Sequence, residues 1–230
     1  MYAIIDQRSP EVVKNNLAKY VDDVFEFSSE NITYNSISGH PDIFMFQDSE
    51  KLIIAPNSPK NLIDFLNKKK VNYALGIKEV GESLEESSRY NCYSTKDYFF
   101  CNQGKPDKSI QNYCANKQLI LVPQSYVRCS MFSFNGRKFI TSDLGIAKVL
   151  ENNKMDYFYF DPTAINIADH KYGFIGGTVG EMEDKLFFLG NILKHKDGCG
   201  LQDYITANQK QVICLGNDYL YDGGGLFFVE

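Results

Sequence analysis

Apolar and polar positions follow one pattern along this chain that returns about five times, at intervals of roughly 46 residues. Each copy predicts two alternating strands joined by a turn, then a helix with one apolar face, then a short apolar strand. The clearest copy has predicted strands at 42–46, 51–55 and 71–77, with a helix beginning near Ser58. Because a unit of this size cannot bury its apolar face alone, the copies are expected to pack together in a single domain, 1–230.

Four of the five predicted helices begin at a residue type that favours a helix N-terminus. Ser9 and Ser58 each precede a proline, which suits the first turn of a helix, so both are expected to cap. Asp107 and Asp143 supply an acidic side chain at the same place in two further copies, and 202–209 is the fifth helix. The apolar strands expected after the five helices are 24–27, 71–77, 119–122, 157–160 and 212–215.

The hairpins and the chain ends complete the pattern. The clearest hairpin is 132–140, with an Asn-Gly turn, and 173–178 with 185–189 forms another. Residues 226–229 predict a first strand without a successor, whereas 2–5 predict a second strand without a predecessor. Joined, they complete a fifth ββαβ module, so we expect a closed α/β (α+β) ring about a pseudo-fivefold axis. Such a ring leaves no sheet edge exposed.

The composition limits the classes of function that this chain can have. With 230 residues, of which 43% are hydrophobic, the chain can bury a full core. Its formal charge of −5 argues against nucleic-acid binding, which favours a basic face. No apolar run approaches the roughly 18–20 residues that cross a bilayer, and 1–10 lacks the pattern of a signal peptide. The six cysteines show no metal-type C-x-x-C pair, so we expect reduced thiols in the cytoplasm, no metal and no cofactor.

Candidate chemistry gathers where the innermost strands of the predicted ring begin. In a closed ring these starts converge on the axis, so their side chains face one another across a shared cleft. Polar, titratable and glycine residues are concentrated at them. The five starts are residues 39–42, 90–93, 128–130, 172–174 and 221–225.

Two of these starts carry residues suited to proton transfer and nucleophilic attack. His40 and Asp42 are two positions apart, so on an extended strand both side chains point to one side. A histidine beside a carboxylate can shuttle protons, although a histidine before a proline also serves simply as a turn residue. Cys129 follows Arg128, whose charge would lower the thiol pKa and favour the nucleophilic thiolate. The alternative for Cys129 is a buried, inert thiol.

Two further carboxylates and a glycine pair complete the candidates. Asp222 precedes three glycines, which let the backbone approach a ligand closely, although a tight turn at the ring closure explains them too. Asp143 either faces the cleft or only gains from the dipole of the helix that it opens. Gly176 and Gly177 lack the Lys-Ser/Thr of a phosphate loop and predict a strand that a neighbouring chain or a ligand approaches.

Six motifs span nearly the whole chain, namely Gly39–Asp42, Gln124–Ser130, Thr141–Ile146, Tyr172–Gly177, Lys185–Gly190 and Asp222–Gly224. In these motifs the chain resembles a bacterial family of unknown function that has the guanidino-group-modifying-enzyme fold. This fold is also called the pentein fold or five-bladed α/β propeller. The resemblance agrees with the closed ring of five modules that the repeat predicts.

The resemblance also implies chemistry. The wider fold includes arginine and agmatine deiminases, dimethylarginine hydrolases and amidinotransferases. In those enzymes a cysteine attacks the guanidinium carbon, a histidine moves protons, and carboxylates hold the cationic nitrogens. By that resemblance His40 matches the histidine and Cys129 would be the nucleophile. In the deiminases, however, the cysteine lies in the last module, where this chain has Leu226-Phe227-Phe228.

Two hypotheses follow from the sequence, which leaves the oligomeric state open. The first is a Cys/His hydrolase or transferase for a small guanidine or other cation, with Cys129 as nucleophile and His40 as acid and base. The second is a non-catalytic binding protein, similar to the ribosome anti-association factor of the same fold, that uses one face of the propeller for a macromolecular partner. In the first hypothesis the substrate-binding residues are Asp42, Asp143, Asp222, Arg128, Gly176 and Gly177.

Overall fold

The computed structural model describes residues 1–230, and its strands form five separate three-stranded sheets in a mixed α/β fold. In each sheet the central strand pairs antiparallel with one neighbour and parallel with the other, which fits the five predicted modules. Sheet by sheet, the strands are β15 (Phe227–Val229), β1 (Tyr2–Asp6) and β2 (Asp23–Phe27); β3 (Met45–Gln47), β4 (Leu52–Ile54) and β5 (Ala74–Leu75); β6 (Tyr93–Ser94), β7 (Tyr98–Cys101) and β8 (Gln118–Leu121); β9 (Met131–Phe134), β10 (Lys138–Thr141) and β11 (Asp156–Tyr159); β12 (Val179–Met182), β13 (Lys185–Phe188) and β14 (Gln211–Cys214).

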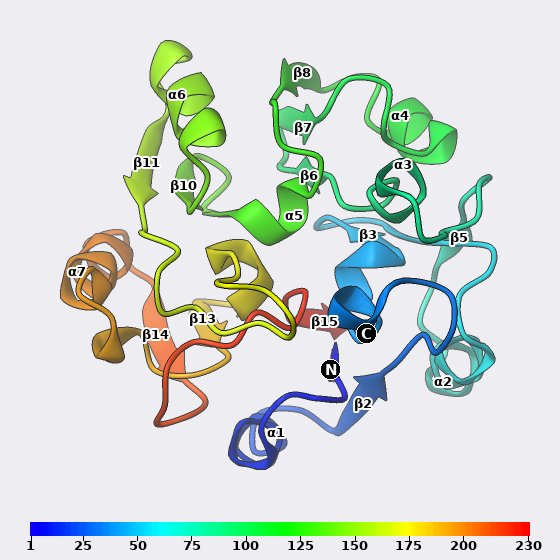
Figure 1. Ribbon diagram of the computed structural model, residues 1–230, viewed down its shortest axis with the longest axis horizontal. Helices are drawn as coiled ribbons and strands as arrows, with labels where there is room; N and C mark the ends of the chain where they lie inside the picture. The colour runs from blue at the N-terminus through cyan, green and yellow to red at the C-terminus, as the bar shows by residue number, and fades with distance from the viewer.

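A helix connects the central strand of each sheet to its parallel neighbour. These five helices lie at the outside of the molecule, with the strand hairpins nearer the middle (Figure 1). None of the helices has the length and apolar character needed to cross a bilayer. The five are α1 (Glu11–Leu17), α2 (Lys60–Lys69), α4 (Lys108–Tyr113), α6 (Leu144–Asn152) and α7 (Gly198–Ala207). The shorter turns are α3 (Leu84–Ser87), α5 (Val127–Ser130) and the 3₁₀ turns η1 (Asn35–Ile37), η2 (Pro41–Ile43), η3 (Ile175–Thr178) and η4 (Ile192–Lys194).

The two ends of the chain share one sheet, as the half-modules predict. β15 pairs antiparallel with β1, and the register aligns Tyr2 with Val229 and Ile4 with Phe227. Both termini therefore lie close together near the middle of the view (Figure 1). Each sheet nevertheless remains a separate three-stranded unit, and no sheet is continuous around the molecule.

Neighbouring modules bury their apolar residues together. Three buried clusters are present, and each contains residues from at least two of the five sheets. The largest has 23 residues and joins Phe27 of β2, Phe46 of β3 and Phe99 of β7. Since each module uses its neighbours to cover its apolar face, the innermost strand starts are held in fixed relative positions.

The structure differs from the sequence prediction at two helix starts. Ser9 and Ser58 do not cap, because Pro10 and Pro59 occupy the N-cap positions and neither has a side-chain acceptor. The two serine hydroxyls are buried without a hydrogen-bond partner. At α4 and α6 the acidic caps are as predicted: Asp107 accepts from Ser109 N and Asp143 from Ile146 N, each at 2.8 Å. The fifth helix, predicted at 202–209, begins earlier, at Gly198.

The strand predicted at 173–178 is also different. Residues 175–178 form the 3₁₀ turn η3, and the strand β12 begins only at Val179. A methyl group added to Gly176 would lie 2.2 Å from the carbonyl oxygen of Arg128. The backbone of η3 therefore lies against the backbone of α5, which bends the chain before the strand can start.

Candidate active site

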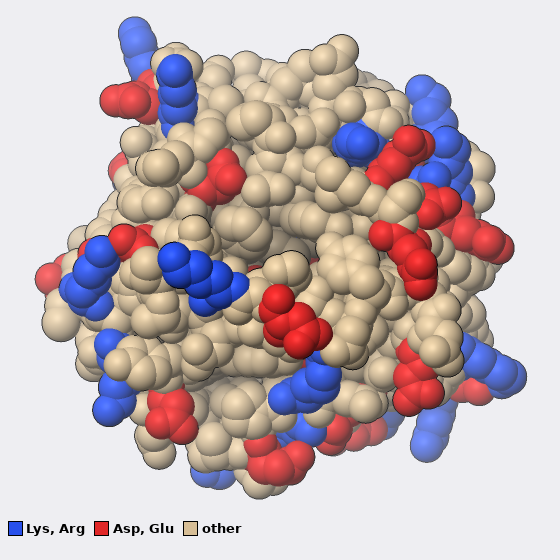
Figure 2. Space-filling view, viewed as in Figure 1, with Lys and Arg blue, Asp and Glu red and all other residues tan.

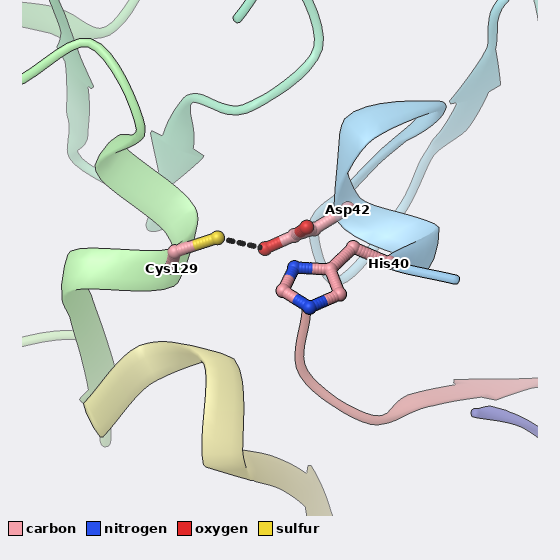
Figure 3. A group of neighbouring side chains, drawn as sticks. All are labelled: His40, Asp42 and Cys129. Carbon is pink, nitrogen blue, oxygen red and sulfur yellow. Dashed lines mark hydrogen bonds between the residues drawn. The ribbon is translucent and has the colours of Figure 1, made fainter. Parts of the chain in front are cut away.

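The site is built from segments that immediately precede inner strands. His40 lies in extended backbone at the start of η2, which carries Asp42 and leads into β3. The prediction of one straight strand for the two residues was wrong, because Pro41 opens a 3₁₀ turn between them. Cys129 belongs to α5, which leads into β9. Figure 3 shows all three side chains pointing toward one another from these two segments.

The closest contact in the site joins the thiol to a carboxylate. Cys129 Sγ donates a hydrogen bond to Asp42 Oδ2 at 2.8 Å, across 87 positions of sequence (Figure 3). Asn91, at the start that leads into β6, holds the same cysteine from the other side. Its Oδ1 accepts from Cys129 N at 3.2 Å, and its Nδ2 donates to Sγ at 3.3 Å. Three segments are therefore joined around one sulfur atom.

Burial controls the protonation of this pair. It raises the pKa of Cys129 well above the ordinary 9.0, and the charges of Asp42 and Asp222 act in the same direction. Burial also raises the pKa of Asp42 from 3.8 to about 6, against the hydrogen bond from Cys129 and the charge of Arg128. The resting thiol is therefore protonated, and its proton already points at a carboxylate oxygen with unusual affinity for it.

His40 is buried, and neither of its ring nitrogens has a hydrogen-bond partner. Burial lowers its pKa, while the carboxylates of Asp222 and Asp6 oppose that change. The ring is consequently neutral near pH 7. Asp42 Oδ1 is likewise buried without a partner. Since buried polar atoms are nearly always hydrogen-bonded, these free atoms mark the place where a ligand would bind.

A second carboxylate, which the sequence did not indicate, lies beside the histidine. Asp6, at the end of β1, lies with its Oδ2 3.9 Å from His40 Nε2. The same oxygen accepts from Arg8 Nη2 at 2.8 Å and from Tyr221 Oη at 3.2 Å. The sequence offered one signal for this residue: an acid at the end of a predicted strand, two residues before an arginine. Asn91 lay within a predicted start, yet nothing in its local sequence indicated a contact with sulfur.

Asp222 lies close enough to His40 for its charge to act on the ring, and both of its oxygens accept backbone hydrogen bonds. Phe174 N donates to Oδ2 at 2.8 Å, and Gly224 N donates to Oδ1 at 3.1 Å. A methyl group on Gly177 would lie 1.8 Å from Asp222 Oδ1. Gly177 is therefore required by the close approach of this carboxylate, and Asp222 ties η3 to the last module while its charge acts on His40.

The side chain of Arg128 points away from the thiol of Cys129. Its guanidinium donates to the carbonyl oxygens of Gly176 at 2.6 Å and Val179 at 3.1 Å, away from the sulfur. It also lies 5.2 Å from the ring centre of Phe132. The expected lowering of the Cys129 pKa by this neighbour is therefore wrong, because adjacent side chains of α5 point apart and burial dominates at the thiol.

Asp143 is a helix cap. Its Oδ1 accepts from Ile146 N at 2.8 Å, and its Oδ2 accepts from Gln124 Nε2 at 3.0 Å. No hydrogen bond connects it to His40 or Cys129. Of the two roles that the sequence left open for Asp143, its contacts are those of the cap.

The candidate site and a cavity of about 500 Å³ lie at opposite ends of the inner strands. The cavity is lined by residues near the far ends of these strands, including Gln47, Ser94, Ser133 and Glu181, and by Arg128. The side chains around Cys129 do not line it. Figure 2 shows a separate hollow near the middle of the face that is seen in Figure 1, over the region where α5, η3 and β15 meet.

The solved structures that match this chain include enzymes that modify guanidino groups. Agmatine deiminase from C. jejuni aligns with a TM-score of 0.57 and 10% identity, over 94% of this chain and 86% of that chain. An amidinotransferase of saxitoxin biosynthesis from Microseira wollei gives 0.54 and 8%, over 93% and 88%. A cysteine mutant of DDAH from Pseudomonas aeruginosa, complexed with citrulline, gives 0.51 and 7%, over 92% and 90%. These three proteins are pentein-fold enzymes. Because their sequence identities to this chain are 10% or lower, the comparison shows a shared fold and nothing more.

Sequence comparison identifies the family directly. No curated protein matches the chain by sequence. A family model does match, over residues 4–227, and thus over almost the whole length. The chain therefore belongs to DUF6873, a family of unknown function.

Proposed function

We propose that this protein is a pentein-fold hydrolase or transferase that acts on a small guanidine or related cation, with Cys129 as its nucleophile. The observation that carries the proposal is the buried contact between Cys129 Sγ and Asp42 Oδ2, with His40 beside it. The fold supports the substrate class, because the solved structures that share it are a deiminase, an amidinotransferase and DDAH. A cationic substrate also suits a site that gathers several carboxylates.

The covalent step begins when Cys129 Sγ attacks the guanidinium carbon and its proton passes to Asp42 Oδ2. His40 carries that proton to one nitrogen, the bond from carbon to that nitrogen breaks, and ammonia or an amine leaves. In a hydrolase, water then attacks the carbon and the carbon–sulfur bond breaks. One proton of the water returns to the thiol, and the other leaves with the amine as an ammonium ion. The net reaction converts a guanidine and water into a urea and an amine. In a transferase, an acceptor amine replaces the water.

The remaining site residues take supporting roles in this proposal. Asp42 acts first as the proton acceptor and, once the proton has moved on, as a negative partner for the cation, together with Asp222. Gly176 and Gly177 form the wall of the site, where only glycine fits. Arg128 acts through its charge on Asp42 rather than through contact with the substrate. Asp143 remains a helix cap outside the proposed site.

We also infer that the five modules close into a ring about a pseudo-fivefold axis, with the site at one end of that axis. Support comes from the equivalent strand order of the five sheets and from the pairing of Tyr2 with Val229. The location that we propose is the cytoplasm, supported by six cysteines that are all free.

The proposal is tested with a panel of guanidino compounds scored for released ammonia, amine or urea. The protein is compared with Cys129→Ser, and Cys199→Ser is the matched control because Cys199 is exposed on α7. Turnover of at least one compound is expected, abolished by the first substitution and unchanged by the second. Turnover that survives Cys129→Ser would exclude the assigned nucleophile.

One observation favours a second candidate, a non-catalytic binding protein of this fold. Cys129 is only 5% exposed, so the thiol lies behind other atoms in the form described. Selective alkylation separates the two candidates. A site that admits substrate allows a small uncharged reagent to modify Cys129, whereas a sealed structural thiol stays unmodified while the exposed Cys199 reacts.

A further inference from the structure

Three potential metal ligands lie together in the interior at the candidate site. They are His40, Asp42 and Cys129, whose donor atoms all lie within 4.8 Å of one another. The three residues are 1%, 0% and 5% exposed, respectively. They come from two segments, η2 and α5, that lead into strands of different sheets, so the fold brings Cys129 to the other two residues.

Three polar atoms of this group have no hydrogen-bond partner, whereas Cys129 Sγ and Asp42 Oδ2 bind each other. Both ring nitrogens of His40 and Oδ1 of Asp42 are buried and have no hydrogen-bond partner. Asp42 forms no ion pair with a lysine or arginine, although it lies fully inside the protein. The only positive charge that acts on this buried carboxylate is that of Arg128, which makes no contact with it, and a dication would supply a direct partner.

We propose that His40, Asp42 and Cys129 bind one zinc ion and leave its fourth coordination position open. Thiolate, imidazole and carboxylate are the ligands that Zn²⁺ uses in proteins, and three of them with an open position form a known arrangement. Mg²⁺ and Ca²⁺ require mostly oxygen ligands, so this donor set excludes them as the preferred ion.

The geometry fits after a small adjustment. Bond lengths of about 2.0–2.3 Å around a tetrahedral zinc ion separate its ligand atoms by about 3.4 Å. The Sγ–Oδ2 distance of 2.8 Å and the outer limit of 4.8 Å lie on either side of that value. Movements of about 1 Å are therefore sufficient to bring the three donor atoms to these separations.

The surrounding residues support metal binding at the same atoms. His40 Nε2 lies 3.9 Å from Asp6 Oδ2, so an approach of about 1 Å would let it donate to that carboxylate, as in a carboxylate–histidine–metal arrangement, and Nδ1 is left for the metal. Figure 3 shows one ring nitrogen turned toward Asp42 and Cys129 and the other turned away. Asn91 Nδ2 donates to Cys129 Sγ at 3.3 Å and so orients the sulfur.

Zinc at this site would occupy the sulfur that the proposed reaction uses. This consequence rests on the proposed function: a bound ion makes Cys129 unavailable to the guanidinium carbon, so zinc is a reversible inhibitor. The metal site itself does not depend on turnover, because its ligands and their geometry are properties of the resting protein.

The test begins with protein from which metal has been removed by a chelator. Cobalt(II) is added as a spectroscopic probe, since a thiolate ligand gives an intense charge-transfer absorption, and zinc is then titrated against a chelating dye. The variants are Cys129→Ser, His40→Gln and Asp42→Asn, with Cys199→Ser as the control. Circular dichroism and thermal melting without metal check that each variant is folded.

We expect one ion per chain and a charge-transfer band that disappears in Cys129→Ser and persists in Cys199→Ser. Each of the three ligand variants should bind zinc at least about 100-fold more weakly, beyond the 10–100-fold typical of losing an outer-shell partner. In the unsubstituted protein, zinc should also protect Cys129 from alkylation while Cys199 still reacts. This last measurement needs no variant, so it stands even if a substitution prevents folding.

Two results would overturn the metal site: a charge-transfer band that persists in Cys129→Ser, or alkylation of Cys129 that is unaffected by zinc. The same experiments distinguish a wrong metal site from a wrong enzymatic function. Turnover that depends on Cys129 but is insensitive to zinc removes the metal site alone. Specific zinc binding without turnover of any guanidino compound removes the enzyme alone.

Discussion

Replacement of Asp42 by asparagine is the sharpest test of how the site is buried. Asparagine has nearly the same shape and keeps an oxygen that accepts from Cys129, but it cannot ionise. Asp42 is fully buried, and its pKa is raised from 3.8 to about 6, chiefly by desolvation. The substitution therefore removes the charge and leaves the packing in place.

The sign and size of the effect follow from proton binding. The folded protein holds the Asp42 proton more tightly than the unfolded chain, so the free energy of unfolding falls as pH rises through the interval from 3.8 to about 6. That interval corresponds to about 3 kcal/mol, since one unit of pKa is worth about 1.36 kcal/mol. About 2 kcal/mol of this loss falls between roughly pH 4.5 and pH 7.5, because part of it has already occurred at the lower pH.

The assay is urea denaturation at those two pH values, with a chelator present to exclude metal. The quantity compared is the free energy of unfolding of Asp42→Asn minus that of the unsubstituted protein. We expect this difference to increase by about 2 kcal/mol at the higher pH. Asp203→Asn, on the outside of α7, is the control and should show no such change. A difference that is equal at the two pH values would refute the desolvated carboxylate on which the site depends.

Three further substitutions test separate parts of the structure. Gly177→Ala should lower the free energy of unfolding by about 1–3 kcal/mol in thermal or urea denaturation, because the added carbon falls 1.8 Å from Asp222 Oδ1; an unchanged stability would show that the two segments are not in contact. Asp143→Ala should cost about 1 kcal/mol through loss of a helix cap while leaving turnover as it was, and a loss of turnover at full occupancy of the fold would return Asp143 to the site. Asn91→Leu should slow the alkylation of Cys129, followed by mass spectrometry, because the amide that donates to the sulfur favours the thiolate; a faster reaction would contradict that role.

The repeating modules were predictable because their signals are local. Hydrophobic periodicity and acidic caps identified the strands and helices, and the half-modules at 2–5 and 226–229 predicted that the ends share a sheet, as the pairing of Tyr2 with Val229 confirms. The errors occurred where a distant segment decides the local conformation. Residues 175–178 have the composition of a strand but form a 3₁₀ turn, because the backbone of α5 lies against them.

For the candidate site, too, the sequence predicted the local features and not the contacts between distant segments. The convergence of strand starts identified the segments of His40, Asp42 and Cys129, since their order in the modules is readable in sequence. Which atom contacts which was not readable. Asp6 reaches His40 and Asn91 reaches the sulfur across module boundaries, and the direction of Arg128 depends on carbonyl groups 48 and 51 positions away.

Direct trapping of the covalent intermediate tests the central claim, that Cys129 is the nucleophile of a guanidino-modifying enzyme. Guanidino compounds are mixed with the protein, the reaction is stopped by acid within the first turnovers, and the digested protein is mapped by mass spectrometry. We predict an added amidino group on Cys129, absent from Cys199 and from the Cys129→Ser protein. Turnover without any adduct on Cys129, or an adduct on another cysteine that is required for turnover, would contradict it.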